Sequence, residues 1–156
     1  MNRPPVRDDL VAMAGYHSPQ VDVEIRLNTN EAPEPPPEMF MRRLLDELSQ
    51  LHLNRYPDRT SSVLRASLAN LHEVDPSEIF VANGSNEVLQ TICLTFGGHG
   101  RVAASFEPTY AMYSQIARSA QMNVVEGLRD EHYRVSVNEL DRVMETYEPA
   151  ITFLCS

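Results

Sequence analysis

From residue 79 to the end of the 156-residue chain, short apolar runs alternate with stretches whose apolar residues recur at helical spacing. The apolar runs predict strands at 79–82, 101–105, 123–127 and 151–155. The stretches between them predict helices at 85–96, 109–120 and 140–147. Because each helix returns the chain to the same end of the next strand, this alternation indicates a mostly parallel sheet with helices on both faces. The sequence therefore predicts an α/β fold whose ligand-binding loops follow the carboxyl ends of the strands.

The first 37 residues do not follow this regular pattern. They hold seven of the eleven prolines, which prevent a helix and favour an extended arm. Within the arm, only the alternating segment 23–27 has the pattern of a strand. We therefore expect a proline-rich N-terminal arm ahead of the folded domain.

Two helices are predicted after the arm, at 38–51 and 61–73, each from a single apolar stripe. Thr60 or Ser61 can cap the second helix. A short helical turn is predicted at 75–78, where an aspartate is followed by a proline and then by a glutamate at the third position.

Charge and composition argue against several classes of function. The net charge is −9 and all thirteen basic residues are arginines, which disfavours a nucleic-acid partner. No stretch approaches the roughly 20 apolar residues of a membrane span, and the first twenty residues lack the apolar run of a signal peptide. We expect a cytoplasmic protein without a membrane partner. Cys93 and Cys155 lack zinc-site spacing and the five histidines are scattered, so we expect reduced core cysteines and no metal.

The turn Asn-Gly-Ser-Asn-Glu at 83–87 joins a predicted strand to a predicted helix. Gly84 allows a tight turn, and the free N–H groups of the helix, together with the Ser85 hydroxyl, can bind a phosphate. The same residues also suit an ordinary helix start, in which Ser85 binds the backbone and Glu87 complements the helix dipole. The turn lacks the patterns of a dinucleotide site, a P-loop or a nucleophile elbow.

The loop Phe-Glu-Pro-Thr-Tyr at 106–110 follows the next strand at the same edge of the sheet. Pro108 restricts the loop, and Thr109 can cap the following helix. Tyr110 would then project beside the phosphate turn, where a phenol can stack on an aromatic cofactor ring. Alternatively, Tyr110 packs on its own helix against Tyr113.

Two polar segments precede these motifs. In the loop 54–58, Tyr56 stands between an arginine and a proline, which makes it either a poised hydroxyl donor or part of a surface turn. The segment 27–33 contains Asn28 and Asn30 and is either a second polar site or an Asx-type turn that leads into the proline arm.

Together, in this order, the four segments resemble the N-terminal half of histidinol-phosphate aminotransferases, which are fold-type I pyridoxal-phosphate enzymes. That family reads LNxNExP, RYPD, a phosphate turn of the G-S-N-E type, and P-x-Y. The matching residues here are 28–33, 55–58, 84–87 and 108–110. The resemblance covers residues 10–156, and it departs from the family at 32–34, where Ala-Pro-Glu replaces the usual Asn-Pro-Tyr.

The resemblance implies pyridoxal 5′-phosphate as cofactor and assigns roles to individual residues. Gly84, Ser85 and Asn86 would bind its phosphate, and Tyr110 would stack on its pyridine ring. Tyr56 would reach across a homodimer interface to the phosphate in the partner's site.

For the substrates, the resemblance implies transfer of an amino group between histidinol phosphate and a 2-oxo acid such as 2-oxoglutarate, in histidine biosynthesis. Asn28 and Asn30 would lie near the substrate. The implied domains are an N-terminal arm with part of the small domain at 1–37, and the first part of the large cofactor-binding domain at 38–156.

Transamination in this family needs a lysine, both as the Schiff-base anchor of the cofactor and as the base. This chain contains no lysine, and arginine cannot replace it because it stays protonated. We therefore predict no catalytic residue here and no activity for this chain alone. The final run at 151–155 reads as an interior strand without a following site loop, so a chain truncated at its C-terminus is expected.

Other interpretations stay open at this point. The chain can belong to an aromatic-amino-acid aminotransferase or a phosphothreonine decarboxylase of the same fold. It can also be a truncated product without catalytic activity, or a small flavodoxin-like binding domain.

Overall fold

The structure is a computed structural model that describes residues 4–11, 13, 22–25 and 31–156. The chain divides into two compact units, one made of residues 1–16 and 80–156 and the other of residues 17–79. Each unit is described by itself. These units have other boundaries than the domains predicted at 1–37 and 38–156, which stay a prediction.

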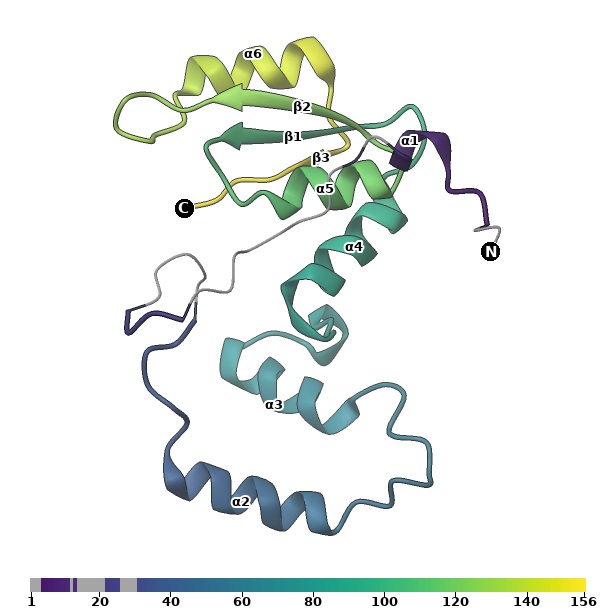
Figure 1. Ribbon diagram of the computed structural model, residues 1–156, viewed down its shortest axis with the longest axis vertical. Coiled ribbons are helices and arrows are strands. Elements are labelled where there is room, and N and C mark those ends of the chain that lie inside the picture. The colour runs from purple at the N-terminus through teal and green to yellow at the C-terminus, as the bar shows by residue number, and fades with distance from the viewer. Residues whose placement is uncertain (1–3, 12, 14–21, 26–30) are drawn as a thin grey trace. The chain divides into compact units, whose positions relative to one another are not determined.

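Residues 80–156 form a three-stranded parallel sheet in the order β2-β1-β3 (Figure 1). The strands are β1 (Val102–Glu107), β2 (Asn123–Leu128) and β3 (Ile151–Thr152). Val102 pairs with Asn123 on one side of β1, and Ala103 pairs with Ile151 on the other. The central strand β1 is therefore flanked on both edges, and its four middle residues are buried.

Helices cover both faces of this sheet. Helices α4 (Gly84–Phe96) and α5 (Met112–Ser119) lie on one face and α6 (Val137–Tyr147) lies on the other (Figure 1). Each helix has one apolar stripe, which explains why it packs on the sheet rather than extending into solvent. The predicted α/β architecture with a parallel sheet and helices on both faces is therefore observed.

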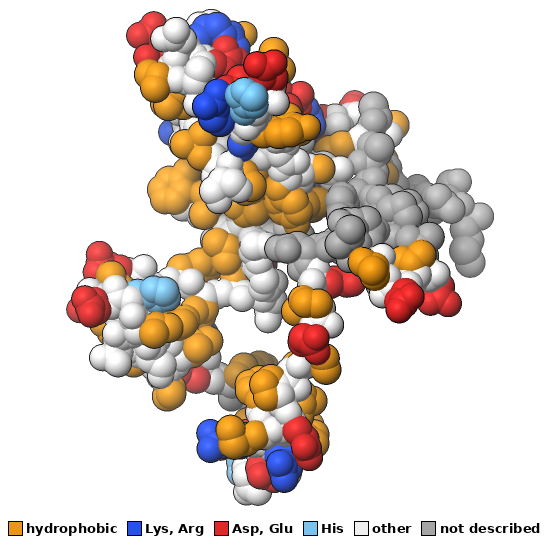
Figure 2. Space-filling view, turned by 90° about the vertical axis from the view of Figure 1, so that its left-hand side faces the viewer, with side chains coloured by type: hydrophobic (Ala, Val, Ile, Leu, Met, Phe, Trp, Pro, Cys, Tyr) orange, Lys and Arg blue, Asp and Glu red, His pale blue; other side chains and the backbone are white. Residues whose placement is uncertain are grey.

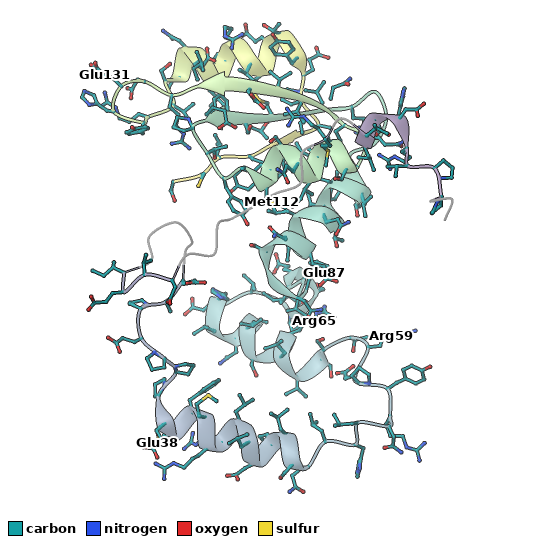
Figure 3. All side chains as sticks on the ribbon, viewed as in Figure 1. Glu38, Arg59, Arg65, Glu87, Met112 and Glu131 are labelled. Atoms are coloured by element: carbon teal, nitrogen blue, oxygen red, sulfur yellow. The ribbon has the colours of Figure 1, made fainter. Side chains whose placement is uncertain are left out.

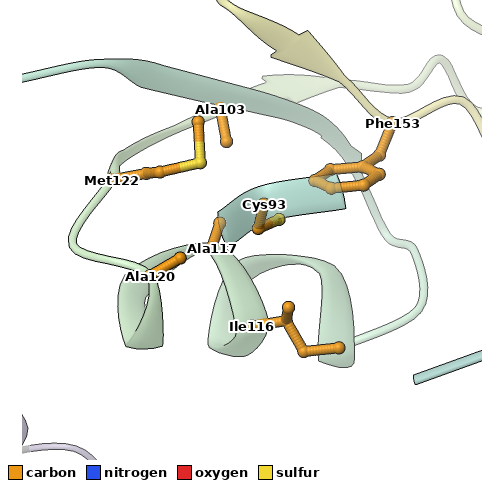
Figure 4. Packing of buried hydrophobic residues seen from close by; sticks show 7 residues of the cluster. All are labelled: Cys93, Ala103, Ile116, Ala117, Ala120, Met122 and Phe153. Atoms are coloured by element: carbon orange, nitrogen blue, oxygen red, sulfur yellow. The ribbon is translucent and has the colours of Figure 1, made fainter. Parts of the chain in front are cut away.

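One core lies between β1, α4 and α5 (Figure 4). Its buried members are Cys93, Ala103, Ile116, Ala117, Ala120, Met122 and Phe153. The thiol of Cys93 is fully buried, and this burial raises its pKa. Cys93 is thus a core residue as predicted, whereas Cys155 is only half-buried.

A second core lies on the opposite face of β1. It joins Ala104 and Phe106 of β1 to Val143 of α6, and all three side chains are fully buried. The ring of Phe106 lies against Gly127, where an added Cβ would stand 2.6 Å from Phe106 Cδ1. This close approach explains why β2 carries a glycine at that position.

The N-terminal segment of the same unit contains the short helix α1 (Asp8–Val11). Arg7 pairs with the Asp9 carboxylate at 2.7 Å, and its guanidinium also donates to the main-chain oxygen of Ser119 at 3.2 Å. One hydrogen bond therefore ties this segment to the end of α5.

Residues 17–79 contain the helices α2 (Glu38–Ser49) and α3 (Ser62–His72) and the 3-10 turn η1 (Pro76–Glu78). All three were predicted. The turn η1 has the expected capping box, with Asp75 accepting from the Ser77 N–H and Glu78 accepting from the Asp75 N–H. Both predicted roles of these carboxylates are confirmed.

The predicted cap of α3 was wrong. Ser61 stands at the N-cap but makes no side-chain cap hydrogen bond. The carboxylate of Asp58 accepts from the N–H groups of Thr60 and Ser62 instead, at 2.9 and 2.6 Å. A carboxylate accepts two donors and favours the positive end of the helix dipole, so it competes effectively with a hydroxyl.

Three strand predictions need correction. Residues 79–82 form no strand, because within the described chain no strand pairs with them and a strand requires a hydrogen-bonded neighbour. The last run was predicted at 151–155, but β3 ends at Thr152. Val23–Ile25 is not a strand, and the rest of that predicted segment lies outside the described residues.

Apolar side chains remain exposed on both units. The exposed apolar side chains of α2 are Met41, Leu44, Leu45 and Leu48 of the predicted stripe, together with Met39 and Phe40. Figure 2 shows hydrophobic side chains interspersed with charged ones on the visible surface. Among the described residues, no helix has the length and apolar character to cross a membrane.

Candidate functional site

The turn before α4 has the geometry of an open helix start. Gly84 has a φ of +79°, which L side chains rarely adopt, and an added Cβ there would meet open space. The N-cap Asn83 makes no side-chain cap hydrogen bond. The N–H groups of the first turn, at Ser85 and Asn86, therefore have no partner within the helix or its cap.

Glu87 has a different role in this turn. Its carboxylate accepts from the Asn83 N–H at 2.7 Å, and the residue lies in the first turn of α4 (Figure 3). The carboxylate thus fixes the entrance of the helix, which agrees with the helix-start interpretation of this residue. In the described part of the chain, the Ser85 hydroxyl has no hydrogen-bond partner, so it is not used as a cap.

Tyr110 comes from a separate loop and meets the same turn. Its hydroxyl donates to Asn86 Oδ1 at 3.1 Å. The turn 83–87 and the loop 106–110 therefore lie side by side, joined by two residues that are 24 positions apart in the sequence. This contact gives the juxtaposition that the predicted site requires.

The ring of Tyr110 is supported from one side. It meets Tyr113 edge to face, with centroids 5.4 Å apart, and Tyr113 stacks on Phe153 at 4.7 Å. The Tyr110 side chain is still 39% exposed. Packing against Tyr113, which was the alternative interpretation, is therefore also observed, and it coexists with an accessible ring.

The loop between β1 and α5 is held by its own carboxylate. Glu107 accepts from the Thr109 N–H at 3.0 Å, and Ser105 Oγ lies 3.4 Å from its other oxygen. The prediction that Thr109 caps α5 was wrong, because the helix begins at Met112 with Ala111 as its N-cap. The Thr109 hydroxyl is buried and has no partner in the described structure.

A shallow cavity of about 230 Å³ lies between α4 and α5 beside Asn86. Its lining consists of Asn86, Gln90, Met112, Ile116 and Ser119. Among the described residues, the polar side chains that line this cavity are those of Asn86, Gln90 and Ser119, and none of them is charged. The cavity therefore adjoins the turn through Asn86.

The roles predicted for three other site residues are not tested by the structure. Tyr56 lies in the other unit, in the loop before α3, and its side chain is fully exposed. Its predicted role across a dimer interface stays a prediction. Asn28 and Asn30 lie outside the described residues, so their predicted role near the substrate stays a prediction as well.

Arg129 was not singled out from the sequence, yet it joins several loops at the carboxyl edge of the sheet. Its guanidinium donates to the main-chain oxygens of Phe106, Tyr133 and Cys155. The sequence feature that could have identified Arg129 is its position just after a predicted strand, at the edge of the sheet where ligand-binding loops lie.

The family model for aminotransferases of class I and II matches residues 22–155 of the chain. The chain belongs to this family. The match includes the turn before α4 and the loop that carries Tyr110, so both parts of the candidate site lie within the aminotransferase sequence.

Curated aminotransferases resemble almost the whole chain. The histidinol-phosphate aminotransferase of Frankia casuarinae is 41% identical over 97% of this chain and 40% of its own length. That of Thermobifida fusca is 42% identical over 97% and 42%, and that of Corynebacterium diphtheriae is 36% identical over 99% and 44%. The chain therefore spans about two fifths of the length of these relatives.

Solved aminotransferases share the fold. The histidinol-phosphate aminotransferase of Sinorhizobium meliloti, in complex with pyridoxal 5′-phosphate, matches 74% of this chain with a TM-score of 0.63 at 15% identity. The α-aminoadipate aminotransferase of Thermus thermophilus, complexed with N-(5′-phosphopyridoxyl)-L-leucine, matches 72% with a TM-score of 0.60. At such identities the likeness shows the fold alone, and it confirms the predicted partial large domain of a fold-type I enzyme.

Proposed function

We propose that this protein takes part in the pyridoxal-phosphate-dependent transamination of histidinol phosphate with a 2-oxo acid such as 2-oxoglutarate. The observation that carries the proposal is the hydrogen bond from the Tyr110 hydroxyl to Asn86, which joins a ring-covering residue to a phosphate turn. The names of relatives 36–42% identical favour histidinol phosphate over other amino donors. This reaction would be a step of histidine biosynthesis and would take place in the cytoplasm.

The residues present fit a phosphate ester. Gly84 keeps the turn open, and the first N–H groups of α4 carry the positive end of the helix dipole. The acidic residue nearby, Glu87, has one carboxylate oxygen engaged with the Asn83 N–H. The donor set at Ser85 and Asn86 is therefore suited to an anion.

Each residue of the site has a separate task. Ser85 and Asn86 donate their main-chain N–H groups to the phosphate, and the Ser85 hydroxyl adds a third donor. Tyr110 would stack its ring on the pyridine of the bound cofactor and would exclude water there. Pyridoxal phosphate, when bound, supplies the electron sink that makes amino-group transfer possible.

This chain contains no lysine to hold the cofactor covalently or to move a proton at the α-carbon of the amino donor. Arginine stays protonated and cannot act as that base. We therefore propose that the 156-residue chain binds the cofactor without a covalent bond and does not catalyse transamination alone. Tyr56 of a second subunit and the segment with Asn28 and Asn30 are proposed to complete the site.

Binding of pyridoxine 5′-phosphate tests the site directly, because this analogue lacks the aldehyde that would react with the chain's amino terminus. We expect it to bind about 10- to 100-fold more tightly than pyridoxine, since charge-assisted hydrogen bonds hold the phosphate. Ser85→Ala should reduce this preference, and Ser67→Ala, in α3 of the other unit, should leave it unchanged. Equal binding of both ligands would refute the phosphate turn.

A genetic experiment tests the substrate. Disruption of the gene that contains this sequence should make its host require histidine, and the whole gene should restore growth without it. Growth without histidine in the disrupted strain, combined with normal binding of pyridoxine 5′-phosphate, would exclude histidinol phosphate and retain the cofactor site.

A further inference from the structure

Arg129 connects the end of β2 to β1 and to the segment that follows β3. It follows directly on β2, and its side chain is half-buried. Its Nε donates to Phe106 O of β1 at 3.0 Å, and its Nη2 donates to Cys155 O, just beyond β3. Its Nη1 donates to Tyr133 O at 2.8 Å, in the loop after β2.

The partners of Arg129 are unusual for a charged side chain. Among the described residues, its guanidinium pairs with no carboxylate and binds three main-chain oxygens instead. Phe106 lies near the end of β1, whereas Tyr133 and Cys155 lie in the segments that follow β2 and β3, where no strand ladder supplies a donor. The guanidinium therefore supplies hydrogen-bond donors to main-chain oxygens that no strand ladder satisfies. It does so at the edge of the sheet where the loop 106–110 begins.

A series of hydrogen bonds leads from Arg129 along the loop 106–110 to Tyr110. The main-chain N–H of Arg129 donates to Glu107 O at 2.9 Å, so both Phe106 and Glu107 are held by one residue. The carboxylate of Glu107 then accepts from the Thr109 N–H. Tyr110 is the next residue, and its hydroxyl meets Asn86.

We propose that Arg129 is a positioning residue that holds the loop 106–110 so that the ring of Tyr110 covers the cofactor ring. The proposal rests on the proposed function, because it assigns Tyr110 the ring-covering task. Arg129 touches neither the phosphate turn nor the ring. It sets the direction in which the loop leaves β1.

An arginine is required here for a geometric reason. Its planar guanidinium presents donors on three separate nitrogens, each aimed at a different carbonyl. A lysine keeps the charge but has one nitrogen, which cannot reach the oxygens of Phe106, Tyr133 and Cys155 together. The variant Arg129→Lys therefore removes the clamp without removing the charge.

The test separates binding of the ring from binding of the phosphate. Dissociation constants for inorganic phosphate and for pyridoxine 5′-phosphate are measured on the full 156-residue chain, and the first constant divided by the second reports the contribution of the ring. Arg129→Lys should lower this ratio about three- to tenfold, the range expected for one aromatic contact, and change phosphate affinity less than about twofold. The matched control is Arg101→Lys, whose exposed side chain lies before β1, and it should change neither value.

Two results would overturn the proposal. One is a ratio in Arg129→Lys equal to that of the wild type. The other is a parallel loss of affinity for both ligands, since Arg129 would then support the phosphate turn as much as the ring of Tyr110.

Hydrogen exchange provides a readout that needs no ligand. In Arg129→Lys, the amides of residues 109–113 should exchange faster, and those of 88–96 in α4 should keep the wild-type rate. Unchanged exchange at 109–113 would reject the role of Arg129. If the wild type binds pyridoxine 5′-phosphate no better than phosphate, the proposed cofactor site fails, and the exchange rates still decide whether Arg129 holds the loop.

Discussion

The two units of the chain differ in how they use apolar residues. Residues 80–156 bury both faces of β1 under α4, α5 and α6, with Phe106 and Cys93 fully inaccessible. In the described part of residues 17–79, Ala69 of α3 is the one buried apolar side chain, and α2 buries none. The comparison teaches that helical periodicity can give a helix without burying its apolar residues. Paired strands with helices on both faces are needed to bury them in a core.

The largest expected effect separates these two units by a matched pair of substitutions. Phe106→Ala removes a fully buried ring and should lower the free energy of unfolding by about 3–5 kcal/mol. Phe40→Ala removes a ring of α2 that is 54% exposed and should cost less than about 1 kcal/mol. Urea unfolding followed by circular dichroism measures both, and equal losses would contradict the distinction between the units.

An intermediate effect concerns the local signals that hold the unit 17–79. Asp58→Ala removes the carboxylate that accepts from Thr60 and Ser62, so α3 should lose helical content at its start. Ser61→Ala is the control, because its side chain makes no cap hydrogen bond, and it should have no effect. Helical chemical shifts measured by NMR would decide. A larger loss in Ser61→Ala than in Asp58→Ala would restore the serine cap that the sequence predicted.

The same aspartate gives this unit a dependence on pH. Hydrogen bonds from the Ser62 hydroxyl and from the Thr60 and Ser62 N–H groups hold the pKa of Asp58 well below its usual 3.8. Its stabilising contribution is therefore complete above pH 3.8 and is lost as the pH falls further.

The smallest expected effect lies on the surface of the unit 80–156. The Arg142 guanidinium, followed by the Leu128 N–H, lowers the pKa of Glu139 from 4.5 to about 2. Because the folded pKa lies below the unfolded one, this contribution is complete above pH 4.5 and disappears as the pH falls through 2. Glu139→Gln should lower the melting temperature slightly at pH 7 and not at pH 2, as measured by thermal unfolding. A constant difference between the two pH values would show that packing, and not charge, is responsible.

Much of the site could be predicted from sequence because its signals are local. Gly84 marks a turn that only a residue tolerant of positive φ adopts easily, and Tyr110 follows a strand at the edge where such loops lie. The role of Arg129 could not be read in this way. Its three acceptors come from positions 106, 133 and 155, and no spacing in the sequence relates them.

The failed predictions have a common physical cause. Residues 79–82 have the composition of a strand, yet a strand exists only where a neighbour supplies hydrogen bonds. Thr109 is a residue type that often caps helices, yet α5 begins three residues later, and the Thr109 N–H donates to Glu107. Both outcomes depend on a partner that composition does not specify.

From residue 84 onward, the sequence by itself determined the order of helices and strands, the parallel sheet and the turn before α4, because periodicity and glycine conformation act over a few residues. It also determined that no lysine is present to anchor a cofactor. Only the tertiary structure decided that Tyr110 meets Asn86 and that Arg129 binds main-chain oxygens from three separate segments, because these contacts depend on how distant segments pack together.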